Sequence, residues 1–160
     1  MRSVFFQNPL EYQIQTNEEE WNQGDSIKGR LRVRNMSNGP VSSINCKVTL
    51  AFAVRKEMKT ADPQAWKVLL EKIPISEESL PPLGEINAEW ELKLTNDCPI
   101  TDKSASLFLL FGGEKVLEEG GRIDLRVQLH SSLQSFLQTF TTQFKFLEKH
   151  RKSKEDYTEI

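Results

Sequence analysis

Basic side chains recur at every second position in one stretch of the chain, WNQGDSIKGRLRVRN, residues 21–35. The four cations are Lys28, Arg30, Arg32 and Arg34. Alternate side chains of an extended strand share one face, with a spacing of about 6.6 Å. A row of guanidinium and ammonium groups at this spacing can meet phosphates or the carboxylates of an acidic peptide. The stretch therefore predicts a surface for contact with an anion or a partner.

Residue types that support catalysis or metal binding do not form a recognisable pattern. The two histidines, His130 and His150, lie far apart, and neither is near a nucleophile motif. The spacings of a nucleophile elbow, a redox cysteine pair, a zinc-protease helix and a phosphate-binding loop are missing. Asp97 and Asp102 fall in turn-like sequence rather than in a predicted buried pair. We therefore expect no enzyme activity, no metal and no cofactor.

The composition is that of one globular domain. A chain of 160 residues with 38% hydrophobic residues can bury a core without disulfides or metals. The net charge of −2 provides no bulk positive field, so we do not expect nucleic-acid binding. Cys46 and Cys98 lie beside apolar stretches and are expected to be reduced, buried thiols. Without a secretory signal or a membrane-length apolar run, the expected location is the cytoplasm.

The elements that would position the basic row are mostly strands. Apolar Ile27, Leu31 and Val33 alternate with the four cations, which is the period of a half-buried strand. Further strands are predicted at 9–16, 43–58, 66–75, 86–94, 104–111 and 123–129. Segment 104–111 is almost continuously apolar, which indicates a central strand covered on both faces or an edge occupied by a partner. Turn residues separate these segments, so the pattern predicts an all-β fold.

The hydrophobic period changes after His130. Apolar residues at helical spacing are Leu133, Phe136, Leu137 and Phe140. Ser131 or Ser132 is a suitable N-cap, so we predict an amphipathic helix of about three turns. A strand with Phe144 and Phe146 is predicted next, and continuation of the helix is the alternative. The expected division is a sandwich at 1–130 and a helix with a strand-like tail at 131–160. That second part either docks on the sandwich or leads to an absent second domain.

The order of these elements resembles the N-terminal domain of the arrestin fold. A G-D-x-I-x-G turn at residues 24–29 opens a strand, a long strand pair follows, and EWELKLTNDCPIT at 89–101 precedes an apolar strand and a final one. The nearest family is that of the bacterial arrestin-like sporulation-control proteins, whose interdomain junction is similar to residues 122–146. The resemblance covers most of residues 9–147. It implies an immunoglobulin-like, arrestin-like β-sandwich of about seven to nine strands with one short C-terminal helix.

The resemblance also supplies a structural interpretation of the basic row. In the arrestin-like arrangement the row lies beside the strand that carries Glu85, Glu89 and Glu91. Opposite charges would then pair across the strands and contribute a few tenths to about 1 kcal/mol each. Trp21, which follows three glutamates, has two interpretations as well: it packs on the end of the sandwich, or it is offered to a partner.

By this resemblance we expect a non-enzymatic scaffold or regulatory adaptor that binds other proteins through sheet edges or loops. Homodimerisation through an open edge is a related expectation. The alternative is a peripheral membrane or trafficking adaptor that binds anionic lipid through the basic strand face. The expected contact residues are Lys28, Arg30, Arg32, Arg34 and Trp21. A second basic cluster is either a solvated tail or a weak contact for an anionic surface; it comprises Lys145, Lys149, His150, Arg151, Lys152 and Lys154.

Overall fold

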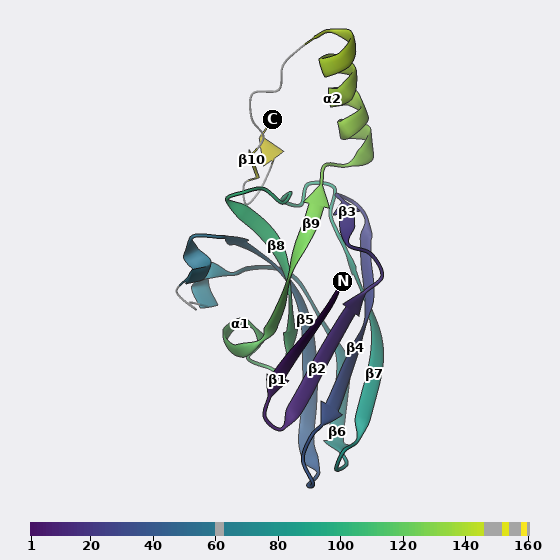
Figure 1. Ribbon diagram of the computed structural model, residues 1–160, viewed down its shortest axis with the longest axis vertical. Helices are drawn as coiled ribbons and strands as arrows, with labels where there is room; N and C mark the ends of the chain where they lie inside the picture. Colours follow the sequence, from purple (N-terminus) through teal and green to yellow (C-terminus); the bar gives the residue numbers. More distant parts are fainter. Residues whose placement is uncertain (60–62, 146–151, 154–157, 160) are drawn as a thin grey trace.

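Two sheets face each other and form a β-sandwich (Figure 1). The computed structural model describes residues 1–59, 63–145, 152–153 and 158–159. The first sheet has the order β1-β2-β4-β7, with β1 (Arg2–Gln7), β2 (Leu10–Thr16), β4 (Ser26–Asn35) and β7 (Glu85–Lys93). The second has the order β3-β9-β8-β5-β6, with β3 (Glu20–Asn22), β9 (Gly121–Gln128), β8 (Ala105–Gly112), β5 (Val41–Val54) and β6 (Lys67–Leu80). The predicted all-β sandwich is confirmed.

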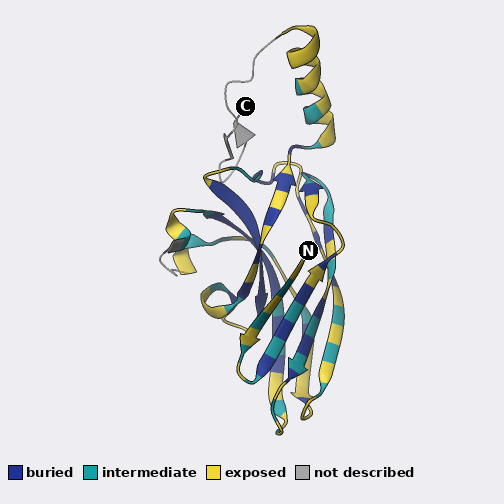
Figure 2. Cartoon of the chain, in the orientation of Figure 1, coloured by how far each residue is buried: buried dark blue, intermediate teal, exposed yellow. Residues whose placement is uncertain are grey.

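The core lies between the inner faces of the two sheets (Figure 2). Strand alternation turns one apolar row of each strand inward, so Ile14, Leu31 and Leu125 are fully buried. Strand β8 is buried along its whole length. Its outward residues Phe108 and Leu110 belong to a second, smaller apolar cluster on the far side of the sheet. The continuous apolar run of β8 therefore reflects a central strand covered on both faces, as one of the two interpretations predicted.

Several strand boundaries differ from the predicted ones. Strand β5 ends at Val54 because the chain then turns into 3-10 helices at Glu57–Lys59 and Pro63–Ala65. Strand β6 pairs with β5 as predicted but continues to Leu80. As the last strand of its sheet, β6 tolerates Pro74 and a run of exposed carboxylates that would disfavour a central strand. Strand β1 was not predicted.

Buried Asn35 ties together the turns at one end of the sandwich. Its side-chain amide donates to the carbonyl oxygens of Gly39 at 2.7 Å, Pro81 at 3.0 Å and Leu80 at 3.3 Å. Its carbonyl oxygen accepts from the backbone N–H and the hydroxyl of Ser37. One side chain thereby joins the β4–β5 and β6–β7 connections.

The predicted Gly24-Asp25 turn organises the opposite end. Gly24 has φ +87°, a conformation that is strained for residues with a Cβ and favours glycine. The carboxylate of Asp25 accepts from the N–H of Asn22 at 2.6 Å, and its backbone carbonyl accepts from Leu94. The turn therefore couples the start of β4 to the end of β7.

In the described residues, two α-helices lie outside the sandwich: α1 (Val116–Glu119) and α2 (Ser131–Gln143). The predicted helix α2 is confirmed, but its N-cap is His130, whose imidazole accepts from Ser132 N–H, and it runs through Thr141 and Thr142. Helix α2 contains no buried residue and extends beyond the end of the sheets (Figures 1 and 2). It does not dock its apolar face on the sandwich.

The tail contributes a two-stranded pairing of β10 (Lys152–Ser153) with β11 (Thr158–Glu159). Phe144 is the C-cap of α2 in the αR conformation, so the predicted strand does not include it. Phe146 and the basic residues at 149–151 and 154 lie outside the described residues, and a strand at Phe146 stays a prediction. In the described part of the chain, no helix has the length and apolarity that a membrane span needs.

Candidate protein-interaction edge

The basic row lies on the outer face of β4, where it faces carboxylates of both neighbouring strands. Lys28 Nζ lies 3.5 Å from Glu91, and Arg30 Nη2 lies 3.4 Å from Glu89, both on β7. The side-chain hydroxyl of Ser26 and the ammonium of Lys28 together lower the pKa of Glu91. The cross-strand pairs of the structural interpretation are therefore present.

Arg32 bridges two strands. Its guanidinium lies 3.3 Å from Glu11 on β2 and 3.6 Å from Glu85 on β7. Arg34 stands opposite the same two glutamates in the strand registers. Four cations thus face four carboxylates, so this face carries little net charge to attract an anion. A hollow of about 850 Å³ above part of this face is lined by these paired groups and by Lys72, Ile73 and Pro74 of β6.

Trp21 lies in β3, which pairs in parallel with the end of β9. The side chain is almost fully buried in the core cluster. The structure therefore places Trp21 in the sandwich and away from the four cations of β4.

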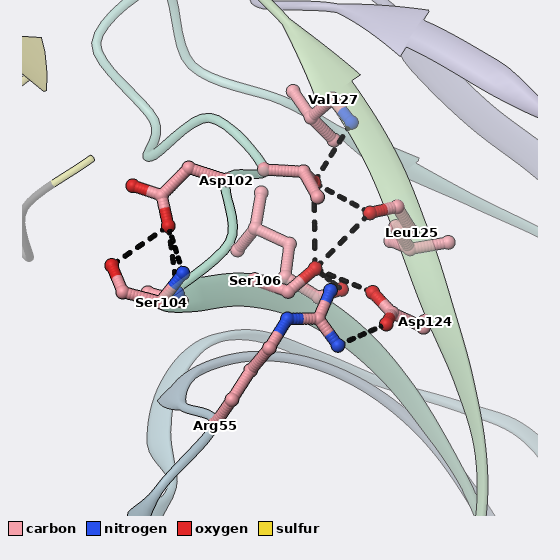
Figure 3. Close-up of polar contacts among 10 residues, drawn as sticks. Arg55, Asp102, Ser104, Ser106, Asp124, Leu125 and Val127 are labelled. Atoms are coloured by element: carbon pink, nitrogen blue, oxygen red, sulfur yellow. Dashed lines mark hydrogen bonds and ion pairs between the residues drawn. The ribbon is translucent and has the colours of Figure 1, made fainter. Parts of the chain in front are cut away.

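The densest polar cluster joins β5, β8 and β9 (Figure 3). The buried hydroxyl of Ser106 donates to Oδ1 of Asp124, and Arg55 Nη1 lies 2.6 Å from Oδ2 of the same carboxylate. Since both carboxylate oxygens are already engaged, the contacts serve to join the three strands.

The connection after β7 is held by the same cluster. The hydroxyl of Thr101 donates to the carbonyl of Leu125 at 2.6 Å and accepts from the N–H of Val127 at 3.1 Å. Oδ1 of Asp102 accepts from the N–H of Ser104 and of Ala105 (Figure 3). These bonds attach the crossing segment to β9 and account for its turn-like acidic residues.

Other chemically active side chains have structural roles. Burial raises the pKa of Cys46 and of Cys98 to about 12, so neither thiol is a nucleophile at neutral pH. His130 caps α2. Among the described residues, no group of His, Cys, Asp and Glu could hold a metal ion.

The edge of β1, unlike the outer face of β4, presents unpaired backbone groups and exposed apolar side chains. Thr16 N–H donates to Met1 carbonyl at 2.9 Å, which marks these two as a hydrogen-bonded pair of the β1–β2 ladder. Such pairs alternate along an antiparallel ladder, so the backbone groups of Arg2, Val4 and Phe6 point away from β2. In the described part of the chain no strand pairs with this edge. Val4 is 42% exposed and Phe6 is 63% exposed.

A groove of about 530 Å³ runs beside this edge. Val4 and Phe5 line one side of it, while Trp66, Leu110 and Leu117 line the other. Phe5 points inward and packs on Tyr12 and Phe111, with ring centroids 6.1 and 6.5 Å apart. The edge thus offers free backbone groups beside a groove whose lining is partly apolar and partly polar, with Glu118 and Arg122 among its residues.

The open edges on the opposite side of the sandwich are protected. Strand β6 carries Pro74 and irregular pairing with β5, both of which obstruct the addition of a strand. Strand β7 carries Glu85, Glu89 and Glu91 and ends at Lys93, and charged side chains discourage the addition of a further strand. Strand β1 has one charged residue, no proline and no bulge. Of these three edge strands, β1 is the one most open to pairing.

The sequence reasoning missed this edge because MRSVFFQ appeared only as a short apolar patch near the N-terminus. Its inward residues Ser3, Phe5 and Gln7 are not uniformly apolar, so the period of two is hidden. The usable signal was three adjacent apolar residues, Val4, Phe5 and Phe6, at least one of which must face outward in a strand.

Solved structures share this arrangement. Spo0M, the sporulation control protein from Bacillus subtilis, superposes with a TM-score of 0.61 at 11% identity, covering 85% of this chain and 56% of Spo0M. The chain shares the fold of Spo0M. The predicted likeness to the arrestin-like sporulation-control proteins is thus confirmed at the level of fold. No protein-family model matches the chain, and no curated protein matches its sequence.

Weaker likenesses extend to parts of larger enzymes. The alkylpurine DNA glycosylase AlkC from Pseudomonas fluorescens has a TM-score of 0.45 at 12% identity, over 79% of this chain and 30% of its own. A β-glucosidase from Listeria innocua has 0.42 at 13%, over 74% and 16%. At these TM-scores the two likenesses carry no argument, and the likeness to Spo0M concerns the fold alone. This chain spans little more than half the length of Spo0M.

Proposed function

We propose that this domain is a non-enzymatic scaffold or regulatory adaptor that binds an extended segment of another protein along β1. The observation that carries the proposal is the coincidence of outward backbone groups and exposed apolar side chains at Val4 and Phe6. A segment added as a strand would gain main-chain hydrogen bonds at the edge and place alternate side chains in the adjacent groove. The fold shared with Spo0M, a sporulation control protein, supports a regulatory role.

The partner expected from this chemistry is an extended peptide with apolar residues at alternate positions. The expected location is the cytoplasm. The lipid alternative through the face of β4 is less favoured because three of its cations are paired with carboxylates. Strand addition should persist at high salt, whereas lipid binding through β4 should fall steeply.

The test is capture from a lysate of the source organism at low and high salt, with wild type and Val4→Pro as baits. Proline at Val4 removes an N–H that points to the open edge and leaves the β1–β2 bonds intact. We expect a salt-resistant partner that is lost with Val4→Pro and with Phe6→Gln. Ile73→Gln, which removes an exposed apolar residue from β6, is the matched control.

Retention of the partner by Val4→Pro and Phe6→Gln would contradict the proposal. If the captured species is a second copy of this chain, the edge supports the homodimer instead. Circular dichroism and thermal unfolding of each variant establish that the sandwich is intact.

A further inference from the structure

The connection between β4 and β5 exposes an asparagine that is followed directly by a glycine. Residues 37–39 are bends rather than members of a strand ladder, and Asn38 is exposed. Within the described part of the chain, no hydrogen bond restrains the backbone or the side chain of Asn38. The carboxamide of Asn38 can therefore approach the backbone nitrogen of Gly39.

Gly39 is not required by the conformation of this connection. Its φ lies outside the left-handed region, in contrast to that of Gly24 at +87°. A Cβ added to Gly39 would meet no atom within 4 Å, whereas one added to Gly29 would lie 2.2 Å from a backbone oxygen. Alanine would therefore fit at position 39 without strain. The property that glycine does supply here is an unhindered backbone nitrogen beside the side chain of Asn38.

We propose that Asn38 is a site of spontaneous deamidation, a modification that makes asparagine a thermolabile residue. Hydroxide removes the proton of the Gly39 N–H, and the backbone nitrogen then bonds to Cγ of Asn38. The side-chain nitrogen takes up a proton from water and leaves as ammonia, so that a succinimide ring remains. A water molecule opens this ring at either carbonyl, which gives an aspartate or an isoaspartyl residue.

The structure predicts different consequences for the two products. The carbonyl oxygen of Gly39 accepts from the amide of Asn35 at 2.7 Å and from the hydroxyl of Ser37 at 2.9 Å. In the isoaspartyl product the main chain runs through the former side chain, so an extra carbon atom separates Gly39 from residue 38. This displacement should break the two bonds to the Gly39 carbonyl. The aspartate product keeps the original main chain and should leave both bonds intact.

The isoaspartyl product would therefore loosen one end of the sandwich. Asn35 also donates to the carbonyl oxygens of Leu80 and Pro81, at 3.3 and 3.0 Å, so it would stay with the β6–β7 connection while Gly39 is released. Molecules accumulate this change with age, so the modification would distinguish old copies of the domain from new ones. The site lies at the end opposite α2 (Figure 1), and the proposal does not depend on partner binding at β1.

The test is incubation of the folded full chain in mildly alkaline buffer, followed by peptide mass spectrometry. We expect Asn38 to deamidate at least about tenfold faster than exposed Asn87, which donates to Glu85 at 3.0 Å and precedes an alanine. Gly39→Ala should slow the reaction at Asn38 by at least about tenfold, because a methyl group hinders the backbone nitrogen. Since the added Cβ meets no neighbour, this variant keeps its fold.

Asn38→Asp is the matched control for the structural consequence, because it introduces the same charge without the isoaspartyl linkage. The deamidated fraction of aged wild type is isolated by anion exchange, and isoaspartyl methyltransferase measures its isoaspartyl content. We expect this fraction to unfold at a lower urea concentration than fresh wild type. Asn38→Asp should unfold at the same concentration as fresh wild type.

Three outcomes would overturn the proposal. In the first, aged wild type keeps its amide at Asn38 while the isolated peptide 33–43 loses it, which would show that the fold protects the site. In the second, Gly39→Ala deamidates as fast as wild type. In the third, the isoaspartyl fraction unfolds at the midpoint of Asn38→Asp, so that the linkage does not affect the turn cluster. Partner capture through β1 should be the same for wild type, Gly39→Ala and Asn38→Asp, so each proposal can fail without the other.

Discussion

The two faces of β4 contribute differently to the protein. On the inner face, Ile27, Leu31 and Val33 are completely buried. On the outer face, Arg30 and Glu89 form a pair whose side chains are 63% and 83% exposed. Burial of each inner residue stabilises the fold by about 1.5–3 kcal/mol, whereas an exposed ion pair contributes about 0–1 kcal/mol. A regular row of charges can thus arise from complementary neighbours as readily as from a ligand.

The largest effect is expected at Gly29, where the inner face of β4 approaches β2 and β7. A Cβ at this position would lie 2.2 Å from the backbone carbonyl oxygen of Gln15 and 2.6 Å from Trp90. Gly29→Ala should therefore destabilise the domain by about 3 kcal/mol or more, measured by urea unfolding. Gly39→Ala, with open space around its Cβ, should stay within about 0.5 kcal/mol. Equal losses of unfolding free energy in Gly29→Ala and Gly39→Ala would contradict the conclusion that close packing around Gly29 excludes a side chain.

Leu31→Ala should cost about 3 kcal/mol, since it leaves a cavity between the sheets. The neighbouring outer-face change Arg30→Gln should cost less than about 0.5 kcal/mol. Thermal unfolding of both single variants tests the contrast directly. A loss of stability in Arg30→Gln as large as that in Leu31→Ala would show that the charged outer face stabilises the fold as strongly as the core residue does.

Alkaline pH should weaken the core. Burial raises the pKa of Cys46 and Cys98 from 9.0 to about 12, and that of Tyr12 from 10.0 to about 12. Between pH 9 and 12 the unfolded chain releases these protons while the folded chain keeps them. The stabilisation is therefore complete below pH 9 and lost above it, at about 1 kcal/mol per thiol by pH 10. Urea midpoints at pH 8 and 10 measure the loss, and Cys46→Ala should reduce it.

The smallest effects distinguish two arginines on the outer face. Arg32 is 31% exposed and contacts two carboxylates, including Glu11, which is 16% exposed. Arg32→Gln should cost about 1 kcal/mol, against a few tenths for Arg30→Gln. Added salt should reduce the cost of Arg30→Gln before it reduces that of Arg32→Gln, because the pair of Arg30 with Glu89 is more exposed. Identical costs at low salt would contradict a role for partial burial.

Much of the fold followed from local pattern. The alternation of β4 correctly predicted a strand with one buried face, because side-chain burial in a strand repeats at two residues. The unbroken apolar run of β8 agrees with the interpretation of a central strand covered on both faces. The continuation of β6 to Leu80 could not be predicted from the sequence, because an edge strand can include Pro74 and exposed carboxylates that a central strand excludes. The position of α2 did not follow either, because an apolar helix face does not specify what covers it.

The candidate site was harder to find than the fold. Lys28, Arg30 and Arg32 attracted attention by their spacing, yet their partners Glu11, Glu85, Glu89 and Glu91 come from two distant segments. The edge at β1 depends on the absence of a neighbouring strand in the described structure, which is a property of topology. Residue spacing alone therefore could not distinguish the paired row from the open edge.

The buried position of Asn35 has a consequence for how this chain could be produced. The sequence Asn35-Met36-Ser37 matches the acceptor motif for N-linked glycosylation. Asn35 is fully buried, and its amide nitrogen donates to three carbonyl oxygens. A glycan would replace one of the two hydrogens on that nitrogen, so not all of those bonds could form, and the sugar could not be accommodated inside the turn cluster. In a secretory host, sugar at this position would consequently mark molecules modified before folding, and the native sandwich would carry none.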